Sequence, residues 1–187
     1  MELSPQECEN LMKRLVFIDD IRNKLLTFSF TAVWAILAIF ISMHSVSTWG
    51  CLIAYFLIIP FSARIAYYRM ASAYISSFLK KFNQADMKFA YAAPYVPEDV
   101  GCKFYGMISW LVNHEMFFLG VAVNVIFYWK FFSQNGTIRF SETNTVLAII
   151  VPNSLLLVTF LILDATFNYK AIMDRYTKKW DLYEKYL

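Results

Sequence analysis

The sequence predicts an all-α membrane protein in which four transmembrane helices form two hairpins with helical extensions into the cytosol. Three observations lead to this fold class. Hydrophobic residues make up 59% of the 187 residues and charged residues only 17%, whereas soluble globular proteins contain about 45–50% and about 25%. The apolar residues form four long blocks, and the positive charges lie almost entirely on one side of these blocks. Such a chain is not a soluble enzyme of ordinary composition, a disordered tail or a disulfide scaffold.

The four apolar blocks cover residues 28–46, 49–68, 111–132 and 143–163. A helix that crosses the hydrocarbon core needs about 20 mostly apolar residues, and each block has this length. Four soluble helices this poor in charge would leave too little polar surface to cover them in so short a chain. The connection between the first two blocks is very short, as is the connection between the last two, and this predicts two hairpins.

Lysine and arginine indicate which ends of the spans face the cytosol. Fifteen of the 17 Lys and Arg residues lie before the first span, around the connection between the second and third spans, or after the fourth. Only Lys130 and Arg139 lie on the other side. Basic residues accumulate in short cytoplasmic loops, so we expect an integral membrane protein with both termini in the cytosol.

The parts outside the spans, residues 1–26, 69–104 and 164–187, are predicted to contain one amphipathic helix each. In the first, Ser4, Pro5 and Glu7 have the spacing of a capping box at a helix start. Residues three and four apart, nearly all of them apolar, place a stripe on one face of each helix. These stripes are Cys8, Leu11, Leu15, Ile18, Arg22 and Leu25; Tyr67, Ala71, Tyr74, Phe78 and Phe82; and Tyr169, Met173, Tyr176, Trp180, Tyr183 and Leu187.

Two arrangements of these cytosolic helices are open. No Pro or Gly separates a helix from its neighbouring span, so we expect each helix to continue that span directly. The three helices then pack into a stalk, and the third stripe is its seam. The alternative is that they lie flat on the membrane as basic amphipathic helices. The narrow stripes favour the stalk, and the Pro-containing part of residues 83–104 is expected to be a return connection.

The sequence contains no familiar catalytic, metal-binding or cofactor-binding motif. Cys8, Cys51 and Cys102 are far apart and form no C-x-x-C pair, which argues against a disulfide framework. His44 and His114 fall at opposite ends of the predicted bilayer, so a zinc site is not expected. A phosphate-binding Gly-rich loop and hydrolase motifs are also missing from the sequence. We therefore expect no metal, no cofactor and no catalytic residue, and topology explains the basic residues without a nucleic acid.

Polar residues inside the third and fourth spans are the candidate functional positions within the membrane. They are Asn113, Gly120, Asn124, Asn153 and Ser154. Small and polar residues often pack transmembrane helices together, and the alternative is that these residues line a hydrated path. Asn124 and Asn153 fall at overlapping depths, so we predict that the two amides meet.

A second candidate is a cluster of charges at the inner edge of the membrane. Arg64, Glu115 and Asp164 fall at one depth when each span is counted separately. An unpaired charge there is costly unless its side chain snorkels to the interface. We therefore predict that Arg64 pairs with Asp164 or Glu115 through its planar guanidinium. Independent snorkelling and an ion or proton site are the alternatives.

These features favour a non-enzymatic integral membrane protein that oligomerises or docks a protein partner through its cytosolic helices, as a subunit of a channel or of a membrane effector would. Two alternatives stay open. The protein is a small carrier or lipid-binding protein that uses the polar residues of the third and fourth spans, or it is a membrane enzyme without a familiar motif. The expected partners are the lipid bilayer and either a second copy or another protein.

Overall fold

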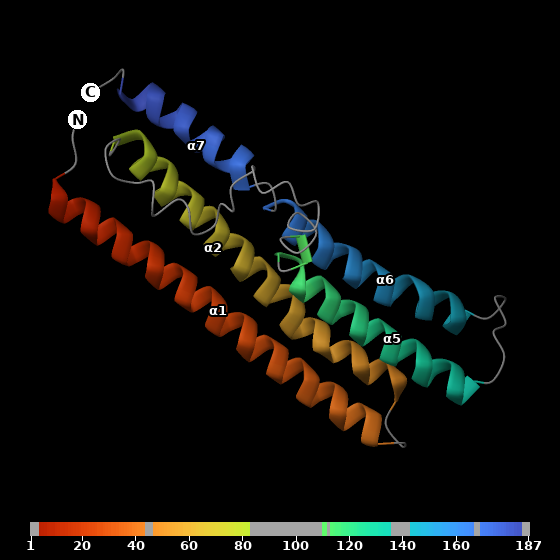
Figure 1. Ribbon diagram of the computed structural model, residues 1–187. Helices are drawn as coiled ribbons and strands as arrows, with labels where there is room; N and C mark the ends of the chain where they lie inside the picture. The colour runs from red at the N-terminus through yellow and green to blue at the C-terminus, as the bar shows by residue number, and fades with distance from the viewer. Residues whose placement is uncertain are drawn as a thin grey trace, which may run out of the picture. The chain divides into compact units, whose positions relative to one another are not determined.

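The computed structural model describes residues 4–43, 47–82, 110–111, 113–135, 143–166 and 169–184. Within these ranges every regular element is a helix (Figure 1), which confirms the predicted all-α class. The elements are α1 (Pro5–Ser42), the 3-10 helix η1 (Thr48–Ala54), α2 (Tyr55–Phe82), α5 (Glu115–Asn135), α6 (Thr143–Asp164) and α7 (Tyr169–Glu184).

Four helical segments are long and apolar enough to cross a membrane. They are Gln6–Ser42, Thr48–Leu79, Glu115–Ser133 and Asn144–Asp164. Each contains one of the four predicted apolar blocks or most of it. The prediction of four membrane-spanning helices is therefore confirmed by length and composition.

Local sequence signals explain where several helices begin and end. The Ser4 amide donates to the Glu7 carboxylate at 3.0 Å, and the Glu7 amide lies 3.3 Å from the Ser4 hydroxyl. These two contacts are the predicted capping box. As expected, α1 and α2 each continue without a break from an apolar block into the adjoining polar sequence, and α2 accommodates Pro60.

The expected continuation of the fourth span into the C-terminal helix is wrong. Helix α6 ends at Asp164, and α7 begins only at Tyr169. Ala165 and Thr166 lie in a turn. The sequence Thr166-Phe167-Asn168 consists of residues with low helix propensity, a signal that the absence of Pro and Gly obscured.

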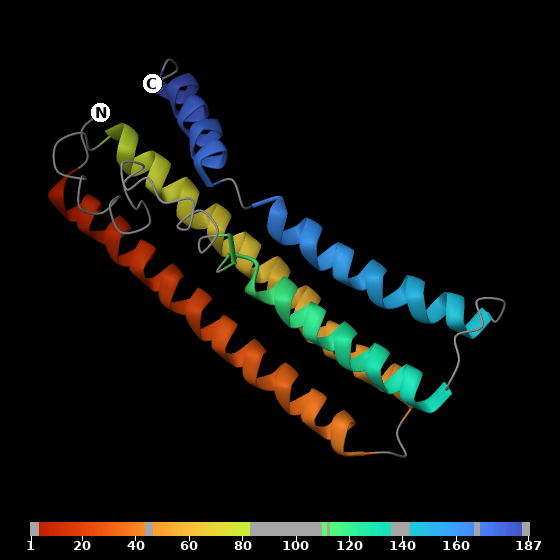
Figure 2. The same ribbon diagram turned by 45° about the vertical axis from the view of Figure 1, so that its right-hand side comes forward.

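The chain divides into two compact units. The span unit comprises residues 24–65 and 114–164, and the terminal unit comprises residues 1–23, 66–113 and 165–187. In the span unit, α5 and α6 lie side by side in both views (Figures 1 and 2). In the terminal unit, α7 packs against the second half of α2.

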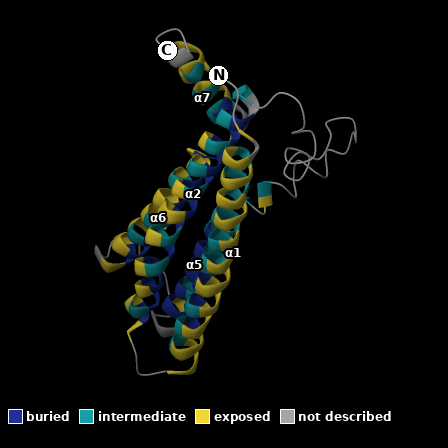
Figure 3. Cartoon of the chain, turned by 90° about the vertical axis from the view of Figure 1, so that its left-hand side faces the viewer, coloured by how far each residue is buried: buried dark blue, intermediate teal, exposed yellow. Residues whose placement is uncertain are grey.

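The surface of the span unit is apolar, as expected for helices in contact with lipid. Phe56, Val125 and Trp129 are 80%, 61% and 60% exposed, although large apolar side chains of this kind usually avoid water. Exposed positions run along α1 and α6 (Figure 3). Inside the unit, Phe127 is fully buried and its ring centroid lies 5.5 Å from that of Trp49.

Candidate functional site

Polar side chains inside the span unit connect one helix with another, and α5 is at the centre of these connections. The Tyr55 hydroxyl lies 2.8 Å from Asn124 Oδ1, and Asn124 Nδ2 donates to the Pro152 carbonyl at 3.2 Å. Tyr55 begins α2, Asn124 lies in α5 and Pro152 lies in α6. We call these three residues the polar tie. It joins three helices in the interior, where Tyr55 is 2% and Asn124 5% exposed.

Hydrogen-bond chemistry fixes the orientation of the Asn124 amide. The Pro152 carbonyl only accepts, so the amide nitrogen must face it and the amide oxygen must face Tyr55. Tyr55 then has to donate its proton to Asn124. The Gly120 carbonyl is a second acceptor, 3.0 Å from the same hydroxyl, so the proton is shared between two α5 acceptors.

Gly120 makes room for this arrangement because it has no side chain. A Cβ at this position would lie 2.9 Å from Leu156 Cδ1 and 3.3 Å from the Tyr55 hydroxyl. The first distance is shorter than real carbon contacts. Gly120 therefore lets α6 and the Tyr55 ring approach the backbone of α5, which is the packing role of small residues in membrane helices.

A buried lysine connects α5 with the end of α1. Lys130 is 6% exposed, and its Nζ lies 2.6 Å from the Phe40 carbonyl and 2.8 Å from the Met43 carbonyl. The last carbonyls of a helix have no partner within the helix, and a cation near this end is favourable. Lys130 therefore caps α1. From the sequence alone, Lys130 was only one of two basic residues on the predicted outer side, and its role at the end of α1 was not predicted.

Asn153 has partners different from those predicted. Asn153 Nδ2 donates to the Tyr128 hydroxyl at 3.0 Å and to the Ile149 carbonyl at 2.9 Å. Asn124 instead bonds to the backbone of the preceding residue, Pro152. The predicted contact between the amides of Asn124 and Asn153 is therefore wrong, although amides of the third and fourth spans do connect these spans. Asn153 and its neighbour Ser154 lie on the exposed side of α6.

The inner-edge charge cluster stays a prediction. The side chains of Arg64 and Asp164 are exposed and that of Glu115 is half-buried. A different arginine is buried: Arg69 is 7% exposed, and its Nη2 donates to the backbone carbonyl of Asn113. Asn113 thus contacts α2 through its backbone, while its side chain is half-buried. The prediction missed Arg69 because it was counted as the first residue beyond the second span.

His114 is buried within the span unit. Its ring is fully buried and stacks on Phe160 of α6, with ring centroids 5.7 Å apart and planes inclined by 27°. The neighbouring residue Glu115 is half-buried. Adjacent residues of a helix point about 100° apart, so His114 and Glu115 were not expected to act together on one substrate atom.

In the terminal unit, α7 packs on the second half of α2 through an aromatic cluster. The Trp180 ring centroid lies 5.0 Å from that of Tyr74 and 4.9 Å from that of Phe78. Trp180 Nε1 donates to the Ser77 hydroxyl at 3.1 Å. The Tyr176 ring lies 5.3 Å from Tyr74, nearly perpendicular to it. Residues of two predicted stripes are thus brought together.

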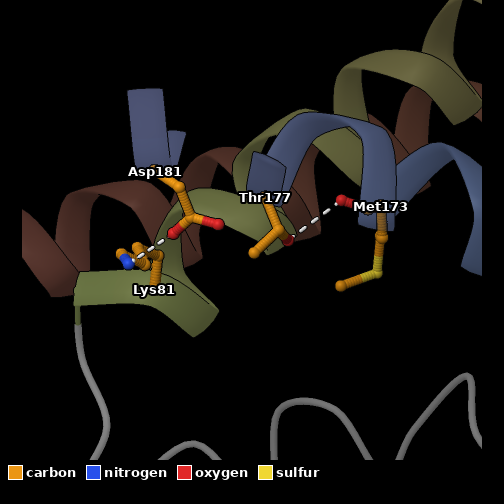
Figure 4. Close-up of polar contacts among 4 residues, drawn as sticks. All are labelled: Lys81, Met173, Thr177 and Asp181. Atoms are coloured by element: carbon orange, nitrogen blue, oxygen red, sulfur yellow. Dashed lines mark hydrogen bonds and ion pairs between the residues drawn. The ribbon is translucent and has the colours of Figure 1, made fainter. Parts of the chain in front are cut away.

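Polar contacts flank the aromatic cluster. Lys81 of α2 and Asp181 of α7 form an ion pair at 2.5 Å (Figure 4). Within α7, the Thr177 hydroxyl donates to the carbonyl of Met173, a residue that is 4% exposed. Of the remaining predicted seam residues, the side chains of Tyr169 and Tyr183, as well as Leu187, lie outside what the structure describes.

Comparisons with protein-family models, curated proteins and solved structures give no match for this chain. In the part of the chain that the structure describes, no group of three or more His, Cys, Asp or Glu side chains could hold a metal ion. The arguments about function therefore depend on the polar contacts described above and on the exposed surfaces.

Proposed function

We propose that this protein is a non-enzymatic integral membrane protein that docks a protein partner or a second copy through helices on the cytosolic side. One observation carries the proposal. In the span unit, Tyr55, Asn124 and Lys130 combine burial with hydrogen bonds to another helix. Polar groups engaged in this way hold helices together and are not available for a substrate.

The proposed topology has both termini in the cytosol, two membrane hairpins and helical extensions on the cytosolic side. Its support is the distribution of Lys and Arg. Single cysteines at Ser141→Cys and Glu184→Cys, in a chain without native cysteines, test it with a membrane-impermeant maleimide added to intact cells. Labelling of Ser141→Cys alone is expected, and labelling of Glu184→Cys alone would contradict the topology.

The N-terminal part of α1 offers a surface for docking. Val16 and Phe17 are 71% and 61% exposed, and they point away from the half-buried stripe on this helix. Lys13, Phe17 and Lys24 share a face at helical spacing and are all exposed. Glu9, which pairs with Lys13 at 2.7 Å, and Asp20 are exposed on the same face, so charges of both signs surround the apolar centre. Such a face fits a partner surface with complementary charges of both signs around an apolar pocket.

Photo-crosslinking from this face tests the docking function. Phe17 is replaced by a benzoylphenylalanine in the full chain in its native membrane, and Phe28 serves as the control because its exposed fraction is also 61%. Phe28 lies within the first predicted span. We expect a discrete protein adduct from position 17 and lipid adducts from position 28. Lipid adducts from both positions would show that α1 lies on the membrane and would reject docking through this face.

Electrical recording in planar bilayers separates the remaining functions. A defined conductance of the purified protein would identify the docking protein as a channel subunit. Saturable uptake of a solute into vesicles, without such a conductance, would instead support the carrier alternative and overturn the proposal.

A further inference from the structure

The outward face of α6 carries a regular stripe that the span unit leaves uncovered. It consists of Leu147, Ile150, Ser154, Leu157 and Leu161, spaced 3, 4, 3 and 4 residues apart. The four apolar members are between 44% and 56% exposed, and Ser154 is exposed as well. This spacing is that of the a and d positions of a coiled coil. We call this stripe the α6 seam.

The opposite face of α6 provides its packing within the span unit. Ala148, Pro152, Thr159 and Leu163 are buried there, and the Pro152 carbonyl accepts the hydrogen bond from Asn124. At 100° per residue these positions lie on the far side of the helix from the α6 seam. The α6 seam is therefore a second face, separate from the contacts that hold α6 in its own unit.

Two polar atoms at the α6 seam are unsatisfied in the middle of the span. In the described part of the chain, the Ser154 hydroxyl forms no hydrogen bond, and Asn153 uses only its amide nitrogen. Asn153 directly flanks the stripe. Ser154 lies 11 residues after the start of α6, or about 16 Å along the axis, near the centre of a core about 30 Å thick. Lipid tails offer no hydrogen bond, so exposing these groups to them is unfavourable.

We propose that the α6 seam is the interface of a homodimer within the membrane. Copies inserted by the same rules share one orientation, so two α6 helices related by a twofold axis along the membrane normal run parallel. Parallel heptad seams align in register, which places Ser154 opposite Ser154. A hydroxyl both donates and accepts, so two serines complete each other.

A second copy accounts for these observations better than lipid does. Lipid tails cover the leucines and the isoleucine but leave the hydroxyl and the Asn153 amide oxygen without partners. Small and polar residues are the usual contacts between membrane helices, and the polar groups at this seam are complementary to themselves. The interface is separate from the docking face on α1, and either one can fail without the other.

Disulfide crosslinking in membranes gives the first test. Single cysteines are placed in the full chain without native cysteines, at Ile150→Cys and Leu157→Cys in the α6 seam and at Val125→Cys as a control. Val125 is 61% exposed on α5, so its cysteine reports random collisions. We expect oxidised dimers from the two seam positions and little from the control. Equal crosslinking at all three positions, or none at the seam, would reject the interface.

The second test measures dimerisation by energy transfer between labelled full-length chains in vesicles, as the chains are diluted with lipid. Ser154→Ala should weaken dimerisation about threefold, the factor that corresponds to an average membrane hydrogen bond. Ser154→Phe should separate the helices and weaken it at least about tenfold, whereas Val125→Phe should leave it unchanged. The residue is exposed, so unchanged far-UV circular dichroism should confirm the fold of each variant. A protein that is monomeric at every lipid ratio, or one equally dimeric with Ser154→Phe, would overturn the proposal.

Discussion

Removing one hydroxyl from the polar tie should measurably destabilise the span unit. Tyr55→Phe keeps a ring that is 2% exposed and so creates no cavity. It removes the proton donated to Asn124 Oδ1 at 2.8 Å and shared with the Gly120 carbonyl. Leaving a buried acceptor without a partner costs about 1–3 kcal/mol in proteins generally, while membrane hydrogen bonds average about 0.6 and reach about 1.7 kcal/mol. We therefore expect a loss of roughly 1 kcal/mol.

Asn124→Ala should cost more than Tyr55→Phe, roughly 2 kcal/mol, because it also removes the bond to Pro152. The two losses should not be additive. Without Asn124, the Tyr55 hydroxyl still has the Gly120 carbonyl at 3.0 Å. Tyr55→Phe should then cost about half as much as in the native chain.

These losses are measured by equilibrium unfolding in mixed micelles. A denaturing detergent is added stepwise, and far-UV circular dichroism follows the loss of helix. Phe56→Leu is the control, because Phe56 is adjacent to Tyr55 but 80% exposed, and its change should stay within about 0.5 kcal/mol. A Tyr55→Phe loss no larger than this control, or strictly additive losses, would refute the polar tie.

Three further predictions follow from the described contacts. Gly120→Ala should destabilise the span unit by about 1 kcal/mol, because its Cβ would lie 2.9 Å from the Leu156 Cδ1 methyl and 3.3 Å from the Tyr55 hydroxyl, and both side chains would have to shift; the same unfolding titration measures this. Lys130→Met should cost about 1–3 kcal/mol, because it leaves the Phe40 carbonyl without its donor, and Lys130→Arg should recover part of that loss. Trp180 is half-buried, so Trp180→Ala should reduce the free energy of unfolding by roughly 2 kcal/mol, less than the 3–5 kcal/mol typical of a fully buried ring. Iodide quenching of Trp180 fluorescence in a chain without other tryptophans checks its packing on α2. Quenching as strong as that of free indole would contradict this packing.

Composition and spacing were sufficient to predict the four helices long and apolar enough to span a membrane. A bilayer requires about 20 apolar residues for each span, so four such blocks gave four spans without knowledge of any contact. The start of α1 was equally local, because Ser4 and Glu7 satisfy each other within one turn. The break after Asp164 was missed because several residues of modest propensity ended the helix together.

Only the tertiary structure decided which residues meet. Counting along a span gives the depth of a residue, but the rotation of each helix about its axis depends on packing against its neighbours. Asn124 and Asn153 were therefore placed at similar depth, yet Asn124 bonds to the Pro152 backbone and Asn153 to Tyr128. Backbone carbonyls also carry no sequence signal as partners. For this reason the contacts of Lys130 with the end of α1, and of Arg69 with the carbonyl of Asn113, became visible only when the helices were packed together.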